Sequence, residues 1–382
     1  MTSISPVRVM QRLEVASGRF SLRRYPLRQR ETLRAWDAAD EYLLNHLGRD
    51  ITGRLLIIND SFGALGCALS GYRPTLQSDS YLSHWSTREN LAANRLDSDQ
   101  VRLISSLDEP SDQYDLVLIR VTKTLALLEH ELIQLKPHLT ASSRVIGCGM
   151  VKQIHSSTLQ LFERIIGPTH TSLAKKKARL IFATVDTDID LPVSPYPVSY
   201  PLEGSAYQLV NHANVFSRDQ LDIGTRLLLQ HIPVNADYRD IIDLGCGNGV
   251  VGLMAAQRNP DARLHFVDES AMAVASAEAT FTGAGLSNPA CFRQGDALSG
   301  FAPASADLIL CNPPFHQGSV VGDATAWRMF NQARRVLRHG GELRIIGNRH
   351  LNYHVKLKRL FGNARQVAAD PKFVVLKSFK TG

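Results

Sequence analysis

The sequence has few cysteines and no long run of apolar residues. Its five cysteines are odd in number and never spaced C-x-x-C, which argues against a disulfide framework and against a zinc site. No apolar stretch approaches the roughly 20 residues that a membrane-spanning helix needs. The N-terminus lacks an apolar segment followed by a small-residue cleavage site, so no secretory signal is expected. These absences predict a cytoplasmic protein with reduced thiols, no bound metal and no membrane anchor.

The composition is ordinary for a folded chain, apart from an excess of positive charge. Hydrophobic residues make up 44% of the 382 residues, enough for the cores of two or three domains. The formal net charge is +7, and residues 1–34 hold eight arginines against two glutamates. Most charge runs are solvated helix faces. Arginine-rich segments in both halves of the chain nevertheless favour a polyanionic partner such as RNA.

Apolar strand patterns and helical patterns alternate twice along the chain. One series runs from about residue 55 to residue 150, and the same order returns after residue 240. The alternation predicts an α/β fold of two tandem Rossmann-like domains that arose by internal duplication, each with a doubly wound parallel sheet. A Pro- and Asp-rich stretch separates the copies. The expected domains are therefore 1–185 and 206–382, with a linker at 186–205.

The clearest local pattern is IIDLGCGNGVVG at residues 241–252. It indicates a buried strand, a glycine turn and the start of a helix, where backbone N–H groups can approach a ligand. A dinucleotide site is disfavoured, because its G-x-G-x-x-G spacing would require glycine where Val250 stands. Taken alone, such a turn serves a ligand or the fold about equally often.

The pattern D-x-G-x-G-x-G resembles the first motif of Rossmann-like methyltransferases that use S-adenosylmethionine (SAM). The resemblance implies that this turn holds the methionine end of SAM. The residues assigned to the turn are Asp243, Gly245, Gly247 and Asn248.

Three further places are expected to contact the cofactor. Asp268 and Glu269 follow the next strand, where an acidic side chain can accept hydrogen bonds from both ribose hydroxyls. The alternative is that Asp268 caps the following helix in competition with Ser270. Related enzymes bracket the adenine at the position of Asp296 and Ala297. Two upstream residues are assigned to closure over SAM, with a helix cap as an equal alternative: Phe216 and Thr225.

Asn312, Pro313, Pro314 and Phe315 follow an apolar strand and form the most specific signal in the chain, and Asn312 is also expected to contact the cofactor. An exocyclic amino group on a base is a poor nucleophile, because its lone pair is delocalised into the ring. The Asn312 side-chain oxygen and the Pro313 carbonyl can accept both N–H bonds and direct the lone pair, while the prolines stiffen the turn. Stacking of Phe315 on the base would contribute roughly 1–3 kcal/mol. The alternative is an ordinary proline turn, which the glycine turn upstream disfavours.

The first copy lacks these groups when the two copies are aligned. FGALG at 62–66 is placed over NGVVG, and YDLVLI at 114–119 is placed over ADLILC. The two alignments give these replacements: Ile57 for Asp243, Asn59 for Gly245 and Arg120 for Asn312. The first domain is therefore expected to fold without a cofactor, to position RNA and to support the second domain.

N-P-P-F after such a strand resembles methyltransferases that act on amino groups of adenine, guanine, cytosine or protein glutamine. A duplicated chain with only the C-terminal copy intact is similar to the ribosomal RNA guanine-N2 methyltransferases, and the segments 216–233 and 326–362 resemble the large-subunit members. The resemblance implies a monomer that uses SAM to methylate guanine N2 in 23S rRNA. The residues by themselves indicate only amino methylation of a polyanion. The rivals are a 16S rRNA or protein-glutamine methyltransferase and a non-catalytic RNA-binding assembly factor.

Overall fold

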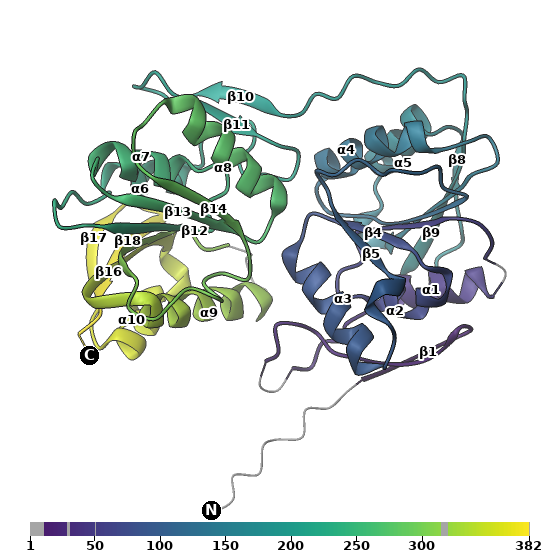
Figure 1. Cartoon of the computed structure of the whole chain (residues 1–382), viewed down its shortest axis with the longest axis horizontal. Helices are drawn as coiled ribbons and strands as arrows, with labels where there is room; N and C mark the ends of the chain where they lie inside the picture. The colour runs from purple at the N-terminus through teal and green to yellow at the C-terminus, as the bar shows by residue number, and fades with distance from the viewer. Residues whose placement is uncertain (1–10, 29–30, 50, 315–319, 382) are drawn as a thin grey trace, which may run out of the picture. The chain divides into compact units, whose positions relative to one another are not determined.

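The computed structural model of the chain describes residues 11–28, 31–49, 51–314 and 320–381. The chain divides into two compact units, Met1–Pro195 and Tyr196–Gly382. Each unit contains a seven-stranded sheet with helices on both faces (Figure 1). The two sheets confirm the predicted α/β class with two tandem Rossmann-like domains. Within the described ranges, no helix is both long enough and apolar enough to cross a bilayer.

The sheet of the first unit has the strand order β5-β4-β3-β6-β7-β9-β8, and a separate hairpin, β1–β2, precedes it. Strands β3 to β7 pair in parallel, whereas β9 is antiparallel to both β7 and β8. The central strand reads LLII, and all four side chains are buried, as a parallel strand covered on both faces requires. The strands are β1 (Gln11–Val15), β2 (Gly18–Leu22), β3 (Leu55–Ile58), β4 (Thr75–Ser78), β5 (Arg102–Ser105), β6 (Leu116–Arg120), β7 (Arg144–Met150), β8 (Thr169–Thr171) and β9 (Ala178–Thr184). The helices are α1 (Ala38–Leu47), α2 (Ala64–Ala68), α3 (Tyr81–Ala93), α4 (Leu125–Leu135) and α5 (Ser156–Ile165).

The second unit repeats this order as β14-β13-β12-β15-β16-β18-β17, with a hairpin, β10–β11, before the sheet. Its first five strands are again parallel, and β18 is antiparallel to both β16 and β17. The strands are β10 (Val198–Pro201), β11 (Gln208–Asn211), β12 (Asp240–Leu244), β13 (Arg263–Asp268), β14 (Ala290–Gln294), β15 (Ala306–Cys311), β16 (Leu337–Asn348), β17 (Arg365–Ala369) and β18 (Phe373–Phe379). The helices are α6 (Ile223–Gln230), α7 (Val250–Arg258), α8 (Ala271–Ala284), α9 (Val320–Val336) and α10 (Tyr353–Phe361).

Different helices fill the two faces of the second sheet. Helices α6, α7 and α8 lie on one face, and α9 and α10 lie on the other (Figure 1). The apolar side chains of the two groups pack in separate clusters. The parallel strands β12, β15 and β16 all end at the same edge of this sheet. Ligands of open α/β sheets bind at the carboxyl ends of the strands, so this edge is where a site is expected.

The segment between the sheets differs from the linker predicted at 186–205. The boundary between the units falls after Pro195, and β10 pairs with β11 so that Val198 lies opposite Asn211. The hairpin is held on α8, where Thr280 Oγ1 accepts a hydrogen bond from the backbone of Val210 at 2.9 Å. A Pro- and Asp-rich segment has low strand propensity. Its strand depends on these distant contacts, which local composition does not reveal.

Candidate functional site

The glycine turn at the end of β12 combines tight packing on one side with open space on the other. Gly245, Gly247 and Gly249 all have positive φ, at 76°, 53° and 79°, a region that favours glycine. A methyl group on Gly249 would lie 2.8 Å from the Cα of Ala277 in α8, whereas one on Gly247 would meet nothing within 4 Å. The turn therefore packs against α8 through Gly249 and leaves room beside Gly247 for a ligand.

Asp243 lies under the turn. Its side chain is 2% exposed, and Oδ2 accepts a hydrogen bond from the backbone N–H of Gly252 at 2.7 Å. Burial, with a smaller contribution from the negative charge of Asp268, raises the pKa of Asp243 to about 8. The structure thus places this carboxyl where it fixes the turn to α7.

Asp268 and Asn248 also connect the turn to its surroundings. Asp268 Oδ2 accepts a hydrogen bond from the backbone of Gly247 at 3.0 Å. Ser270 caps α8 through its hydroxyl, so the cap that competed with the ribose role of Asp268 belongs to Ser270. Asn248 is buried and donates to Asn211 Oδ1 in the hairpin at 3.0 Å. The sequence assigned Asn248 to the cofactor and gave no indication of this link to the hairpin.

At the place predicted to bind adenine, the structure shows an ion pair that the sequence did not predict. Asp296 is buried, and its Oδ1 lies 2.8 Å from Arg328 NH2 of α9. Burial raises the pKa of Asp296, and Arg328 opposes that rise. Ala297 has a left-handed φ of 47°, and the backbone carbonyl of Glu269 accepts a hydrogen bond from Gln294 Nε2. Phe216, assigned to closure over SAM, is 65% exposed.

In the Asn312 side chain the amide nitrogen is hydrogen-bonded, whereas the amide oxygen has no donor among the described residues. Its Nδ2 donates to Thr225 Oγ1 at 2.9 Å. The Thr225 hydroxyl donates in turn to Asp222 Oδ2 at 3.2 Å, and this same oxygen accepts from the Thr225 backbone at 2.7 Å. Because the hydroxyl proton is committed to Asp222, Thr225 must accept from the amide, and the nitrogen of Asn312 must face α6.

The opposite atom, Asn312 Oδ1, is buried and accepts no hydrogen bond from any residue that the structure describes. A buried acceptor without a partner costs free energy, and native proteins rarely leave one unexplained. A methyl group on Gly245 would lie 3.8 Å from the Asn312 carbonyl oxygen, so the glycine turn and this loop are neighbours. The space beside Gly247 and the unsatisfied Asn312 Oδ1 therefore lie on neighbouring segments at the same edge of the sheet.

The rest of the N-P-P-F loop is described only in part. Pro313 is buried and Pro314 is exposed. Phe315 lies outside the described residues. The contact between Asn312 and Thr225 joins two residues that the sequence assigned to separate roles, and the structure gives Thr225 the role of orienting Asn312.

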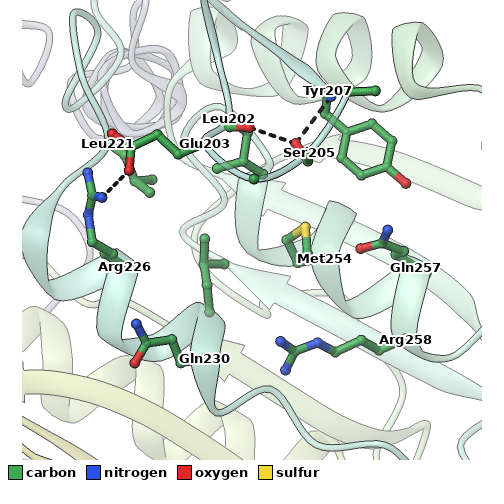
Figure 2. A pocket seen from close by; sticks show the side chains of 13 residues that line it. Leu202, Glu203, Ser205, Tyr207, Leu221, Arg226, Gln230, Met254, Gln257 and Arg258 are labelled. Carbon is green, nitrogen blue, oxygen red and sulfur yellow. Dashed lines mark hydrogen bonds and ion pairs between the residues drawn. The ribbon is translucent and has the colours of Figure 1, made fainter.

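A separate cavity of about 490 Å³ lies on the outer side of α6 and α7 (Figure 2). It is enclosed by the hairpin loop and by side chains such as Tyr207, Arg226 and Met254, and an ion pair joins Glu203 to Arg226 across it. None of the residues predicted for the cofactor or for catalysis lines it. The candidate site is thus the sheet edge and not this cavity.

Known proteins resemble both units. Residues 10–187 match the family model of the RLMG N-terminal domain, and residues 206–377 match that of the methyltransferase small domain. A protein of Streptomyces coelicolor named ribosomal RNA large subunit methyltransferase G is 52% identical over 371 residues, which are 95% of this chain and 98% of that protein. The chain belongs to this family. It is therefore a methyltransferase whose cofactor is SAM.

A second member of the family, from Ectopseudomonas mendocina, is 53% identical over 94% of this chain and 97% of its own length. Among solved structures, the T. thermophilus 16S rRNA N2 methyltransferase RsmC, in complex with AdoMet and guanosine, has a TM-score of 0.74. It is 21% identical and covers 97% of this chain and 98% of that one. This likeness shows that both units share the fold of that enzyme.

Proposed function

We propose that this protein methylates N2 of a guanosine in 23S ribosomal RNA. The observation that carries the proposal is the buried Asn312 Oδ1, which is oriented by Thr225 and lacks a donor among the described residues. An amino group on a base supplies the missing N–H. The names of the family members, which specify the large ribosomal subunit, support the choice of RNA.

The chemistry follows from the geometry of the acceptors. When SAM is bound, it supplies a methyl group on a positively charged sulfur. Asn312 Oδ1 and the Pro313 carbonyl would accept the two N–H bonds of the base, which favours a pyramidal nitrogen and directs its lone pair at the methyl group. The N–C bond forms as the S–C bond breaks, and S-adenosylhomocysteine is the second product. The alkylated nitrogen is acidic and gives its proton to water, so no strong base is required.

RNA contacts are assigned to basic residues outside this edge. Lys175, Lys176 and Lys177 form an exposed turn in the first unit, and Arg359 of α10 is exposed in the second. Such side chains bind phosphates without reading sequence. Guanine N2 in a helix is paired with cytosine, so the enzyme must act on unpaired RNA or extrude the nucleotide, at a cost of a few kcal/mol.

The test is mass mapping of ribosomal RNA from cells that lack the protein, before and after treatment with purified protein and SAM. We expect one guanosine of 23S rRNA to lack its N2 methyl group and to regain it on treatment. A methyl group that appears on 16S rRNA would identify the small-subunit alternative. RNA that gains no methyl group would contradict the proposed substrate.

A further inference from the structure

A second buried amide at the same edge of the sheet has no partner for its oxygen. Asn348 is the last residue of β16, and its side chain is 7% exposed. Its Oδ1 accepts no hydrogen bond from the described part of the chain. Burying an acceptor in this state is unfavourable, so Asn348 shares with Asn312 the one feature that points to a ligand.

The register of the sheet places the two amides on one face. Cys311 of β15 lies opposite Ile345 of β16, so Asn312 is level with Ile346, and Asn348 lies two residues further toward the open edge. Leu310 and Ile346 both pack in the core beneath α6 and α7. Side chains two residues apart on a strand share a face, so Asn312 and Asn348 both project from the face that α6 covers. Neighbouring strands lie about 4.8 Å apart and two residues advance about 6.6 Å along a strand, so the two positions are about 8 Å apart, a separation that a base held between the two side chains can span.

An aromatic side chain lies next to Asn348. Phe373 of β18 lies opposite Asn348. The ring of Phe373 would be 3.0 Å from a methyl group on Gly224, the residue before Thr225. The aromatic ring and the first turn of α6 therefore lie beside the edge at which both amides end.

We propose that Asn348 is a specificity-determining residue whose Oδ1 accepts the N1–H of the substrate guanine. The proposal rests on the proposed function, because it requires that Asn312 hold N2 of the same ring. Guanine carries a ring N–H next to its amino group. Adenine and cytosine carry an acceptor nitrogen at the equivalent place, and uracil has no amino group. Two acceptors side by side therefore match guanine, and a base with an acceptor there would face Asn348 Oδ1 with like charge.

The test compares guanine with 2-aminopurine, which keeps the amino group but lacks N1–H. Once the methylated guanosine is mapped, the full chain is assayed on two RNA fragments that differ only in that base. We expect kcat/KM for guanine to exceed that for 2-aminopurine by about tenfold to a hundredfold, because the unpaired polar group of the site rejects the analogue. In Asn348→Leu the ratio should approach one, mainly through loss of activity on guanine, while the Kd of SAM measured by calorimetry stays unchanged.

Asn331→Leu is the matched control, because Asn331 is exposed on α9 and donates to the carbonyl oxygen of Trp327 in its own helix. It should keep the wild-type ratio. Equal activity of the wild type on the two RNAs would overturn the role of Asn348, and this measurement does not depend on the folding of any variant. An unchanged ratio in Asn348→Leu would overturn it as well. Methylation of the guanine RNA at any atom other than N2 would instead overturn the proposed function.

Discussion

In the first unit β6, which pairs with β3, ends in Arg120. In the second unit β15, which pairs with β12, is followed by Asn312. The two positions correspond, because the partner of Ile57 lies two residues before Arg120 and the partner of Asp243 lies two residues before Asn312. The sheet register thus agrees with the alignment made from the sequence. The same place in one fold holds a cation in one copy and an amide in the other.

Arg120 closes its site with an ion pair. Its guanidinium donates to Asp37 at 3.0 and 2.9 Å, and its Nε lies 3.3 Å from Asp40 Oδ1. Burial would lower the pKa of Arg120, but Asp40 and Asp37 hold it above the usual value. Asp37 caps α1 as Asp222 caps α6. Both units therefore connect this strand to the start of a helix, but only Asn312 keeps an acceptor open.

The glycine turn shows the same contrast. Asn59 has a φ of 66°, which is the left-handed conformation that Gly245 adopts in the second unit. Its amide donates to both oxygens of the buried Glu131, at 2.8 and 2.9 Å. A methyl group on Gly245 would instead have Met329 Cε at 3.5 Å as its nearest neighbour. The first unit therefore pairs the side chain at this position with its own carboxylate, as expected of a domain that binds no cofactor.

Asn312→Ala should have the largest effect on the open site. Removing the acceptor is expected to lower kcat of methyl transfer by about 1,000-fold, as for the loss of a preorganised polar group that acts on the reacting atoms. The Kd of SAM and of the RNA should change little. A tritiated-methyl assay and calorimetry measure these quantities, with Asn331→Ala on the exposed face of α9 as the control. Unchanged turnover in Asn312→Ala would remove Asn312 from the mechanism.

Arg120→Leu tests the closed site. It leaves Asp37 and the buried Asp40 without their cation, which is expected to lower the free energy of unfolding of the first unit by about 3 kcal/mol. SAM affinity should stay at the wild-type level. Thermal unfolding and calorimetry provide the two measurements. Arg164→Leu, which removes an exposed pair with Glu129, should change stability by at most about 1 kcal/mol. Weaker SAM binding in Arg120→Leu would contradict the separation of roles between the units.

Thr225→Val tests whether the hydrogen-bond chain from Asp222 orients Asn312. The substitution keeps the shape but removes the acceptor for Asn312 Nδ2, so the amide can turn its nitrogen toward the substrate. We expect kcat to fall by about tenfold to a hundredfold with little change in the Kd of SAM. Thr225→Ser retains the hydroxyl and should restore most of the activity. If Thr225→Ser is as slow as Thr225→Val, the hydroxyl does not orient the amide.

The sequence was sufficient for the fold, because strand patterns and the glycine turn are local signals. It was insufficient where the residue that makes a contact does not stand at the aligned position of the chain. The alignment placed Ile57 at the position of Asp243 and predicted that the carboxyl was lost. The structure shows that Asp60 is buried and accepts from the backbone of Gly66 at 2.8 Å, as Asp243 does from Gly252. A side chain three residues further on makes the same kind of contact, which alignment by position cannot detect.

The hydrogen-bond and ion-pair partners of the predicted site residues also could not be predicted from the sequence. Thr225 lies 87 residues from Asn312 along the chain, and no periodicity connects them. The ion pair between Asp296 and Arg328 likewise depends on how α9 packs against the sheet. Residue types near the ends of strands were therefore predictable, whereas the orientation of each side chain depends on contacts that form only in the folded unit.

The last expected effect depends on pH and concerns the carboxyl groups that both units bury under their turns. The folded-state pKa of Asp243 is about 8, whereas an unfolded aspartate has a pKa of about 3.9. At a pH between these two pKa values, the Asp243 carboxyl holds a proton in the folded protein that it has lost in the unfolded chain. Stability contributed by this group is therefore present at low pH and is lost as pH rises toward 8. Asp243→Asn keeps an oxygen for the Gly252 N–H but cannot ionise.

The melting temperature of Asp243→Asn relative to wild type should therefore rise by several degrees between about pH 5 and about pH 8 and then level off. Asp219→Asn, at an exposed carboxylate paired with Arg218, should show no such trend. If the difference in melting temperature between Asp243→Asn and wild type does not change with pH, the wild-type carboxyl is ionised in the folded protein. The turn would then be held by a charge, and Asp243 would be available to a cationic group of the cofactor instead of serving only the contact with α7.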